Sequence, residues 1–200
     1  MAPSSRPLSQ VSPYTVTMNA ATDTGQDHDP CLVTDGLGTW VAAWDSTDSL
    51  GGTIGADKDI LVARSTDDGA TWSAPAALNT NAATDGFALE DAVSLATDGT
   101  GTWVATWQST DPLGGTIGTD WDILVARSTD NGAEWTSTEP LNVGIGPYED
   151  SGPSLATDGA GNWVAVWHSN SDAHYSDTDF DILAEMTNQI PVELSGFALD

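Results

Sequence analysis

The residues best suited to chemistry in this chain are aspartates that alternate in three short segments, DKD, DWD and DTDFD. These aspartates are Asp57, Asp59, Asp120, Asp122, Asp177, Asp179 and Asp181. Alternating carboxylates in a loop can point toward one hard cation, and Ca²⁺ prefers such oxygen ligands. None of the segments fits the twelve-residue EF-hand loop, and an aspartate at the start of a strand also blunts a sheet edge. A calcium site and a purely structural loop are therefore both open.

The strong acidity of the chain excludes several classes of partner. The 200 residues carry 30 acidic and 4 basic side chains, for a formal net charge of −26. Nucleic acid and anionic membrane surfaces need clustered lysine and arginine, so neither is an expected partner. No apolar run reaches transmembrane length, so membrane insertion is not expected either. The acidity favours an extracellular or cell-surface protein, whose secretion signal we expect outside this sequence.

The cysteine and histidine residues offer little for a metal or a nucleophile. The single cysteine, Cys31, excludes an internal disulfide framework and a cysteine-based zinc site, and we expect it to be a buried free thiol. His28, His168 and His174 have no regular spacing and no repeated serine partner. Neither zinc ligation nor a Ser-His-Asp nucleophile is therefore predicted. We expect no cofactor, with calcium as the one open case.

An internal repeat organises the chain. Asp48–Trp72 and Asp111–Trp135 are identical at 20 of 25 positions. Pairs of tryptophans mark the register of three copies, with steps of 63 and then 60 residues. These pairs are Trp40/Trp44, Trp103/Trp107 and Trp163/Trp167. Repeats of this length are typical of arrays in which each copy is one supersecondary unit.

Each repeat contains four runs with strand character. In the first copy they are Pro30–Thr34, Thr39–Asp45, Asp59–Ser65 and Thr71–Leu78. A TDGxG segment joins the first two runs and suits a tight hairpin. Both faces of the second run are apolar, so the sheet must be covered on both sides. Four-stranded antiparallel sheets of this kind are typical of β-propeller blades, and we predict an all-β partial propeller of about three blades.

The boundaries of the repeats predict the domain organisation. We place the propeller at 13–190, after a flexible segment at 1–12 and before the start of a following segment at 191–200. Its units lie near 29–85, 91–147 and 150–190. Pro13–Asp23 resembles Pro75–Asp85 and reads as an orphan fourth strand. Closed propellers have four to eight blades, so the expected partners are the remaining blades of a parent chain or a second copy.

The segments STDDGATW and STDNGAEW share the pattern S-x-D-x-G-x-x-W. This pattern, between the third and fourth strands, resembles the Asp box, or BNR repeat, of sialidase-like β-propellers. The matching residues are Ser65, Asp67, Gly69, Trp72, Ser128, Asp130, Gly132 and Trp135. The serine and aspartate oxygens can hold the turn, the glycine permits positive φ and the tryptophan anchors the turn. In that family the box lies on the propeller periphery, so its expected role is structural.

The resemblance also implies which residues a sialidase would need. Members that cleave sialic acid use three arginines, a tyrosine nucleophile assisted by a glutamate, and an aspartate acid/base. Arg64 and Arg127 stand at equivalent repeat positions, and Arg6 lies in the Pro/Ser-rich start, so they cannot form a converging triad. The tyrosines, which share no motif, are Tyr14, Tyr148 and Tyr175. We therefore predict no catalytic residue in this chain and favour a protein that is not an enzyme.

The preferred function is recognition of glycans or surface proteins by a non-catalytic, sialidase-like propeller segment of an extracellular protein. One alternative is a fragment of an exo-α-sialidase or related glycoside hydrolase whose catalytic residues lie in other blades. Another is a purely structural repeat module. Trp121 replaces Lys58 of the first copy and Phe180 of the third. Its ring can stack on a sugar or cover its own blade, and both interpretations stay open.

Overall fold

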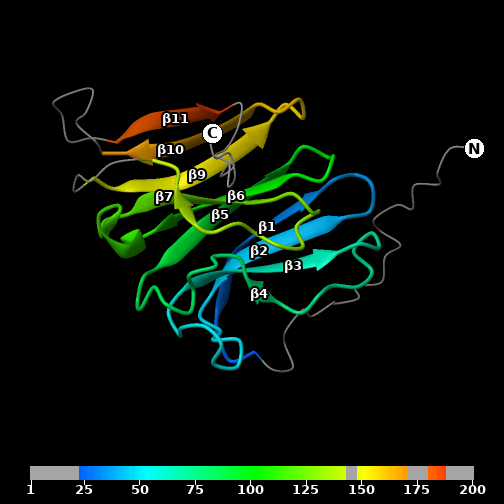
Figure 1. The fold of residues 1–200 in the computed structure, drawn as a ribbon, viewed down its shortest axis with the longest axis horizontal. Coiled ribbons are helices and arrows are strands. Elements are labelled where there is room, and N and C mark those ends of the chain that lie inside the picture. The colour runs from blue at the N-terminus through cyan, green and yellow to red at the C-terminus, as the bar shows by residue number, and fades with distance from the viewer. Residues whose placement is uncertain (1–22, 143–147, 171–179, 188–200) are drawn as a thin grey trace, which may run out of the picture.

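A computed structural model describes residues 23–142, 148–170 and 180–187, which form three antiparallel sheets (Figure 1). Sheet 1 contains β1 (Asp27–Thr34), β2 (Trp40–Ser46), β3 (Asp59–Ser65) and β4 (Ala76–Ala77), in that order. Sheet 2 contains β5 (Glu90–Thr97), β6 (Trp103–Ser109), β7 (Asp122–Ser128) and β8 (Glu139–Pro140). Sheet 3 contains β9 (Asp150–Thr157), β10 (Trp163–Ser169) and β11 (Asp181–Thr187). A single 3₁₀ turn, η2 (Leu113–Gly115), interrupts the described loops, and the prediction of an all-β chain is confirmed.

Some sequence predictions fall outside the described residues. These are the flexible segment 1–12, all but the last residue of the orphan strand Pro13–Asp23, and the final segment 191–200. Within the described ranges, no helix is long and apolar enough to cross a membrane.

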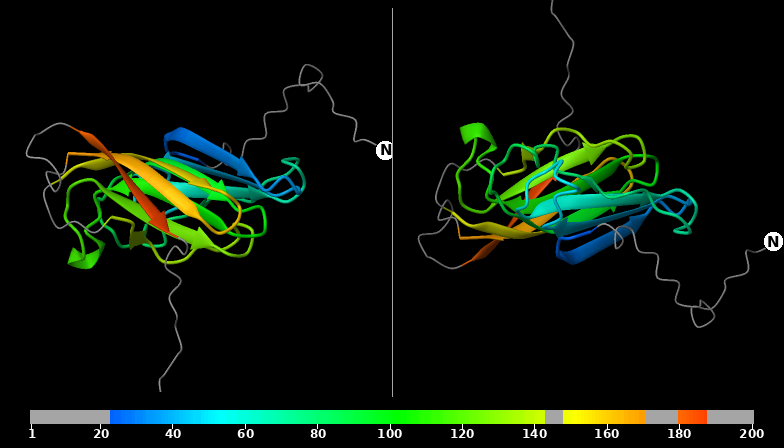
Figure 2. Two further views of the ribbon diagram at one scale, coloured as in Figure 1. Left: turned by 90° about the horizontal axis from the view of Figure 1, so that it is seen from above. Right: turned by 90° about the horizontal axis from the view of Figure 1, so that it is seen from below.

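The sheets lie face to face, with sheet 2 between the other two (Figure 2). The first strands of the three repeats are neighbours, because β5 contacts β1 on one side and β9 on the other. The short strands β4 and β8 form the opposite edges of their sheets. This is the arrangement of adjacent blades, in which first strands gather and last strands lie outermost.

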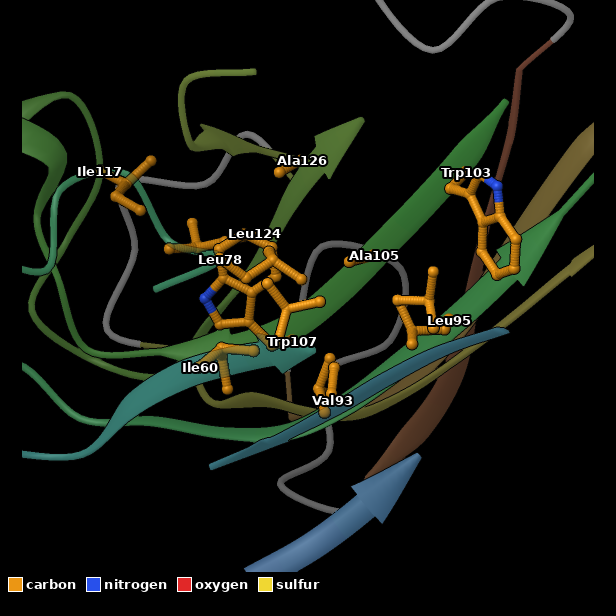
Figure 3. Packing of buried hydrophobic residues seen from close by; sticks show 13 residues of the cluster. Ile60, Leu78, Val93, Leu95, Trp103, Ala105, Trp107, Ile117, Leu124 and Ala126 are labelled. Atoms are coloured by element: carbon orange, nitrogen blue, oxygen red, sulfur yellow. The ribbon is translucent and has the colours of Figure 1, made fainter. Parts of the chain in front are cut away.

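Two apolar contact layers hold the sheets together. We call the contact between sheets 1 and 2 the first junction and that between sheets 2 and 3 the second junction. At the first junction Val41 and Ile60 of sheet 1 pack with Trp107 and Leu124 of sheet 2, and all four are fully buried. Figure 3 shows Ile60, Trp107 and Leu124 in this layer. Burying one indole stabilises the fold by about 4–6 kcal/mol at about 25 cal/mol per Å². The second junction repeats the arrangement with Trp167 facing Ile123.

The outer face of sheet 3 is open to solvent. Ile182 is 74% exposed, whereas its repeat equivalents Ile60 and Ile123 are 0% exposed at the two junctions. Met186, two residues from Ala184 on the same face of β11, is also 74% exposed. A residue that is core in two copies is therefore surface in the third.

The TDGxG hairpins are closed by an aspartate side chain. Asp35 Oδ1 accepts hydrogen bonds from the N–H groups of Leu37 at 2.7 Å and Thr39 at 3.0 Å. Gly36 and Gly38 have φ values of 72° and 112°, which a side chain would strain. The hydrogen bonds are repeated in the other two copies by Asp98 and Asp158.

Two local predictions were wrong. The fourth strand was predicted over Thr71–Leu78 but covers only Ala76–Ala77. The ladder is interrupted because Ser73 Oγ accepts from Arg64 N at 3.0 Å and Pro75 has no N–H to donate. Cys31 is a free thiol but only partly buried, since β1 is an edge strand that is mostly exposed.

Candidate functional site

The first Asp box is a turn closed by its own side chains. Ser65 Oγ accepts from Asp67 N at 3.3 Å and Gly69 N at 3.0 Å, and donates to Asp67 Oδ1 at 2.8 Å. Asp67 also accepts from the Thr71 N–H at 2.8 Å and the Thr71 hydroxyl at 2.6 Å. These bonds, led by the Thr71 hydroxyl, lower the pKa of Asp67 to about 2. Trp72 is partly buried and donates from Nε1 to Gly69 O at 3.2 Å.

The second Asp box has the same turn and an additional contact with the neighbouring sheet. Asp130 Oδ1 accepts from Ser128 Oγ at 2.8 Å and from Glu134 N at 3.0 Å. Gly132, with φ of 76°, lies so close to sheet 1 that a Cβ there would meet Val41 Cγ2 at 2.7 Å. Trp135 packs against the core of the first junction. The second box therefore fastens sheet 2 to sheet 1, in addition to turning the chain.

A pocket of about 380 Å³ lies between the outer edge of sheet 1 and the second box. We call it the edge pocket. Its lining residues are Val62, Ala63, Arg64, Thr66, Thr71, Trp72, Ser73, Ala76, Gly132 and Ala133. The lining combines one indole, one guanidinium and three hydroxyl groups, and it contains no carboxylate. Arg64 Nε is buried without a hydrogen-bond partner, as is Nε of its repeat equivalent Arg127.

The two described arginines of the set that a sialidase would use lie in different sheets. Arg64 is the next-to-last residue of β3 and Arg127 that of β7, each opposite the equivalent valine of its own sheet. Arg6, Tyr14, Tyr175 and His174 lie outside the described residues. Tyr148 precedes β9 and is partly buried.

Two histidines can be placed. His28 is exposed, and its Nδ1 lies 3.8 Å from Asp45 Oδ2. His168 Nε2 lies 2.8 Å from Ser151 Oγ, a contact that the 17-residue separation did not signal. The two residues are cross-strand neighbours of β9 and β10. In the described part of the chain no carboxylate is hydrogen-bonded to His168, so the pair lacks the third group that orients a catalytic imidazole.

The alternating aspartates of the first repeat lie in a four-carboxylate cluster at the first junction. Asp57 and Asp59 are joined there by Asp85 and Glu90, with one oxygen from each residue within 4.8 Å of the others. Sequence reasoning missed the last two residues. Glu90 begins β5 of the neighbouring sheet, and Asp85 lies in the loop after β4. The single signal was that Glu90 occupies the repeat position of Asp27 and Asp150.

The environment of this cluster disfavours charge. Burial, assisted by neighbouring carboxylates, raises the pKa of Asp59 to about 7, that of Asp85 to about 6 and that of Glu90 to about 9. Asn79 Nδ2 donates to Asp59 Oδ1 at 2.8 Å, and Ser109 Oγ donates to Glu90 Oε1 at 2.7 Å. These bonds orient the two buried carboxyl groups.

The alternating aspartates of the other repeats are arranged differently. Asp122 is buried and Asp120 partly buried at the second junction, where burial raises the pKa of Asp122 to about 7. Asp150 completes this group, and both of its oxygens accept hydrogen bonds, from Trp167 Nε1 and from Asn142 Nδ2.

Of the predicted calcium ligands in the third repeat, one lies in the described part of the chain. Asp181 begins β11 and is partly buried, whereas Asp177 and Asp179 lie outside the described residues. Trp121 is partly buried beside β7, and its carbonyl accepts from Asp150 N at 2.7 Å.

A second acidic group at the first junction contains its own cation. Asp29, Asp45 and Asp91 offer oxygens within 4.8 Å of one another. Lys58 Nζ lies 2.8 Å from Asp45 Oδ2 and 3.1 Å from Asp91 Oδ2. Desolvation alone would lower the pKa of Lys58, but hydrogen bonds and charges from both aspartates outweigh it and raise that pKa.

Comparison with known proteins identifies the fold. No protein-family model matches the sequence, and comparison with curated proteins returns no match. An α-L-arabinanase from Penicillium chrysogenum matches with a TM-score of 0.54 and 17% identity, over 82% of this chain and 47% of that one. A Hadza microbial sialidase matches with a TM-score of 0.58 and 19% identity, over 80% of this chain and 35% of that one.

A third match is the α-L-arabinofuranosidase of Fusarium graminearum, with a TM-score of 0.54 and 14% identity over 81% of this chain and 46% of that one. This chain thus spans less than half the length of these structures. The likeness shows the fold: the three sheets are blades of a propeller like those of sialidases and arabinanases, as the Asp-box resemblance predicted.

Proposed function

We propose that this chain is a non-catalytic segment of a sialidase-like propeller, in an extracellular or cell-surface protein, that recognises glycans at the edge pocket. The observation that carries this proposal is the chemistry of the lining: an indole, a guanidinium and three hydroxyls, with no carboxylate. Its volume of about 380 Å³ lies within the range of small-ligand pockets, about 300–1,000 Å³.

The lining suits a sugar for two reasons. A sugar ring has an apolar C–H face that packs on an indole, and Trp72 supplies one. Its hydroxyls need donors, and the guanidinium of Arg64, which lines the pocket, can provide them. A glycoside hydrolase of the usual kind also needs two carboxyl groups that flank the scissile bond. A pocket without carboxylates is thus equipped to bind a glycan and not to cleave it.

The test is a glycan array, followed by calorimetric titration of the best neutral oligosaccharide. Arg64→Gln should weaken binding about tenfold or more, because a hydrogen bond from a charged donor contributes about 1.5–3 kcal/mol. Arg127→Gln is the matched control, since Arg127 has the same repeat position but does not line the pocket. No binding to any glycan, or equal losses in both variants, would favour the purely structural alternative.

The enzyme alternative is supported by the fold, which this chain shares with a sialidase and with arabinan-degrading enzymes. It is tested by incubating the chain with a fluorogenic sialoside and a fluorogenic arabinofuranoside. We expect no turnover of either substrate. Clear hydrolysis above the buffer rate would contradict the non-catalytic proposal.

A further inference from the structure

The four-carboxylate cluster of the first junction has no neutralising partner in the described part of the chain. Asp59 and Glu90 are each 0% exposed, and Asp59 Oδ2 and Glu90 Oε2 have no hydrogen-bond partner. Both oxygens of Asp57 and Oδ1 of Asp85 are likewise buried without a partner. Buried polar atoms in native proteins are nearly always satisfied, so the cluster offers these oxygens to a ligand that can accept their lone pairs.

The cluster is held by backbone as well as side-chain contacts. Glu90 N donates to Lys58 O at 3.0 Å, which places Glu90 beside Asp57 and Asp59 although it belongs to the next sheet. Asn79 fixes one oxygen of Asp59, and its Nδ2 also reaches Asp85 Oδ2 at 3.4 Å. The carboxylates are therefore oriented by neighbours that bind a single oxygen and leave the other available, as is usual around metal ligands.

The neighbouring acidic group, Asp29, Asp45 and Asp91, differs from the four-carboxylate cluster because a lysine ammonium lies within it. There Lys58 lies between Asp45 and Asp91 and pairs with both. No lysine or arginine of the described residues is paired with the four-carboxylate cluster, because the only ion pairs of Lys58 are those with Asp45 and Asp91. The cluster needs a cation from solution, which a net charge of −26 helps to attract.

We propose that Asp57, Asp59, Asp85 and Glu90 bind one Ca²⁺ that fastens sheet 1 to sheet 2. Ca²⁺ takes six to eight oxygen ligands at 2.3–2.6 Å, so opposite ligands are about 4.6–5.2 Å apart. Oxygens that all lie within 4.8 Å of one another can therefore contact one such ion.

The second junction provides a control within the same molecule. Its group contains Asp120, Asp122 and Asp150, but both oxygens of Asp150 already accept hydrogen bonds. The segment between Asn142 and Tyr148 reads VGIGP and contains no counterpart of Asp85. The second junction therefore offers fewer free oxygens, and we expect it not to bind calcium at the same concentrations.

The proposal is tested on the whole 200-residue chain after removal of metals with a chelator. Ca²⁺, added up to about 5 mM, should bind with a Kd on the order of 10⁻⁵–10⁻³ M and a stoichiometry of one. It should also raise the melting temperature. Mg²⁺ should bind at least about tenfold more weakly, because it demands shorter, near-octahedral coordination. The absence of bound Ca²⁺ in equilibrium dialysis would overturn the proposal.

Substitutions assign the site. Glu90→Gln and Asp59→Asn should each weaken Ca²⁺ binding at least about tenfold and remove the calcium-dependent rise in melting temperature. Asp85→Asn, in a loop, provides the same test with little risk to folding. Asp122→Asn is the matched control in the second junction and should leave binding unchanged. Equal losses in Asp122→Asn and Asp59→Asn, or unchanged binding in Asp85→Asn, would refute the assignment. Glycan binding at the edge pocket is a separate outcome.

Discussion

The two junctions between sheets are built from nearly the same sequence, yet their acidic groups differ. Asp59 of the first junction and its equivalent Asp122 of the second each keep one buried oxygen without a partner, and at the first junction Glu90 does so too. At the second junction Asp150 stands in the place of Glu90, and Asn142 and Trp167 satisfy both of its oxygens. The repeats thus share their hairpins and diverge where one sheet faces the next.

One methylene group explains much of this difference. In the first and third repeats an aspartate accepts the indole N–H of the paired tryptophan: Asp27 from Trp44 at 2.9 Å and Asp150 from Trp167 at 3.0 Å. In the second repeat the longer Glu90 accepts from Ser109, as Asp150 does from Ser169 in the third, but Trp107 Nε1 is left without a partner. The extra length carries the carboxylate away from its own tryptophan and into the cluster.

The ion pairs of Lys58 also occur at the first junction and not at the second. Lys58, Asp45 and Asp91 of the first junction correspond to Trp121, Gln108 and Ser151 of the second. All three charged groups are replaced by neutral ones together, as expected of residues that contact one another. In the second junction Gln108 Oε1 accepts from the N–H of Gly152 at 2.8 Å instead of meeting an ammonium.

The largest expected effect concerns the apolar layers of the two junctions. Ile60→Ala and Ile123→Ala should each destabilise the fold by about 2–5 kcal/mol, because both side chains are fully buried. Ile182→Ala should change stability by less than about 0.5 kcal/mol, since that side chain is 74% exposed. Urea unfolding followed by tryptophan fluorescence measures all three. A large loss at Ile182 would mean that the outer face of sheet 3 is covered in solution.

Exchange of the Lys58 group should have the next largest effect. Lys58→Trp leaves Asp45 buried without its cation and should cost about 1–3 kcal/mol. This is less than the roughly 3–5 kcal/mol of a fully buried pair, because the lysine side chain is 25% exposed. The triple variant Asp45→Gln/Lys58→Trp/Asp91→Ser, which installs the residues of the second junction, should recover most of the loss in calcium-free urea titrations. A triple variant no more stable than Lys58→Trp would contradict the comparison.

A smaller effect is expected from exchanging the two acids. Asp150→Glu should destabilise the calcium-free protein by about 1 kcal/mol, because Trp167 Nε1 loses its acceptor. Glu90→Asp is the reciprocal change and should stay within about 1 kcal/mol of the parent, since Trp107 gains an acceptor while a methylene of packing is lost. Thermal unfolding in chelator compares the two variants. An unchanged melting temperature in Asp150→Glu would show that the indole bond is unimportant.

The smallest effect concerns the Asp boxes, which the first and second repeats share. The pKa of Asp67 is lowered to about 2 by Thr71 and Ser65. A lowered folded pKa contributes stability above the unfolded value near 4, and that stability is lost as pH falls from about 4 to about 2. Asp67→Asn should therefore flatten the acid limb of the melting-temperature profile between these values. The pKa of Asp130 is also lowered, led by the N–H of Glu134, so Asp130→Asn should act in the same direction. If the melting temperature of either variant fell with pH as steeply as that of the parent, the hydrogen bonds to that aspartate would not contribute to stability.

Several features of this protein were determined by the sequence by itself. The tryptophan register, the TDGxG turns and the Asp-box pattern predicted the strands and hairpins of each sheet, because hairpins depend on residues close together in the chain. The same local reasoning singled out Asp57 and Asp59 as candidate ligands, and the structure places both in one acidic cluster. It overestimated the fourth strand, since the hydrogen bond from Arg64 N to Ser73 Oγ is a side-chain detail that strand propensity does not contain.

Only the tertiary structure decided which acids meet and which surfaces stay open. Glu90 lies beside Asp59 because its N–H binds the carbonyl of Lys58 across two sheets, a contact between residues 32 positions apart. Ile60 and Ile182 have the same repeat position and differ in burial because, within the described ranges, a neighbouring sheet packs on Ile60 and none packs on Ile182. Local pattern sets the strands and turns of each blade. The chemistry at the junctions depends on long-range packing, which a repeat in the sequence does not encode.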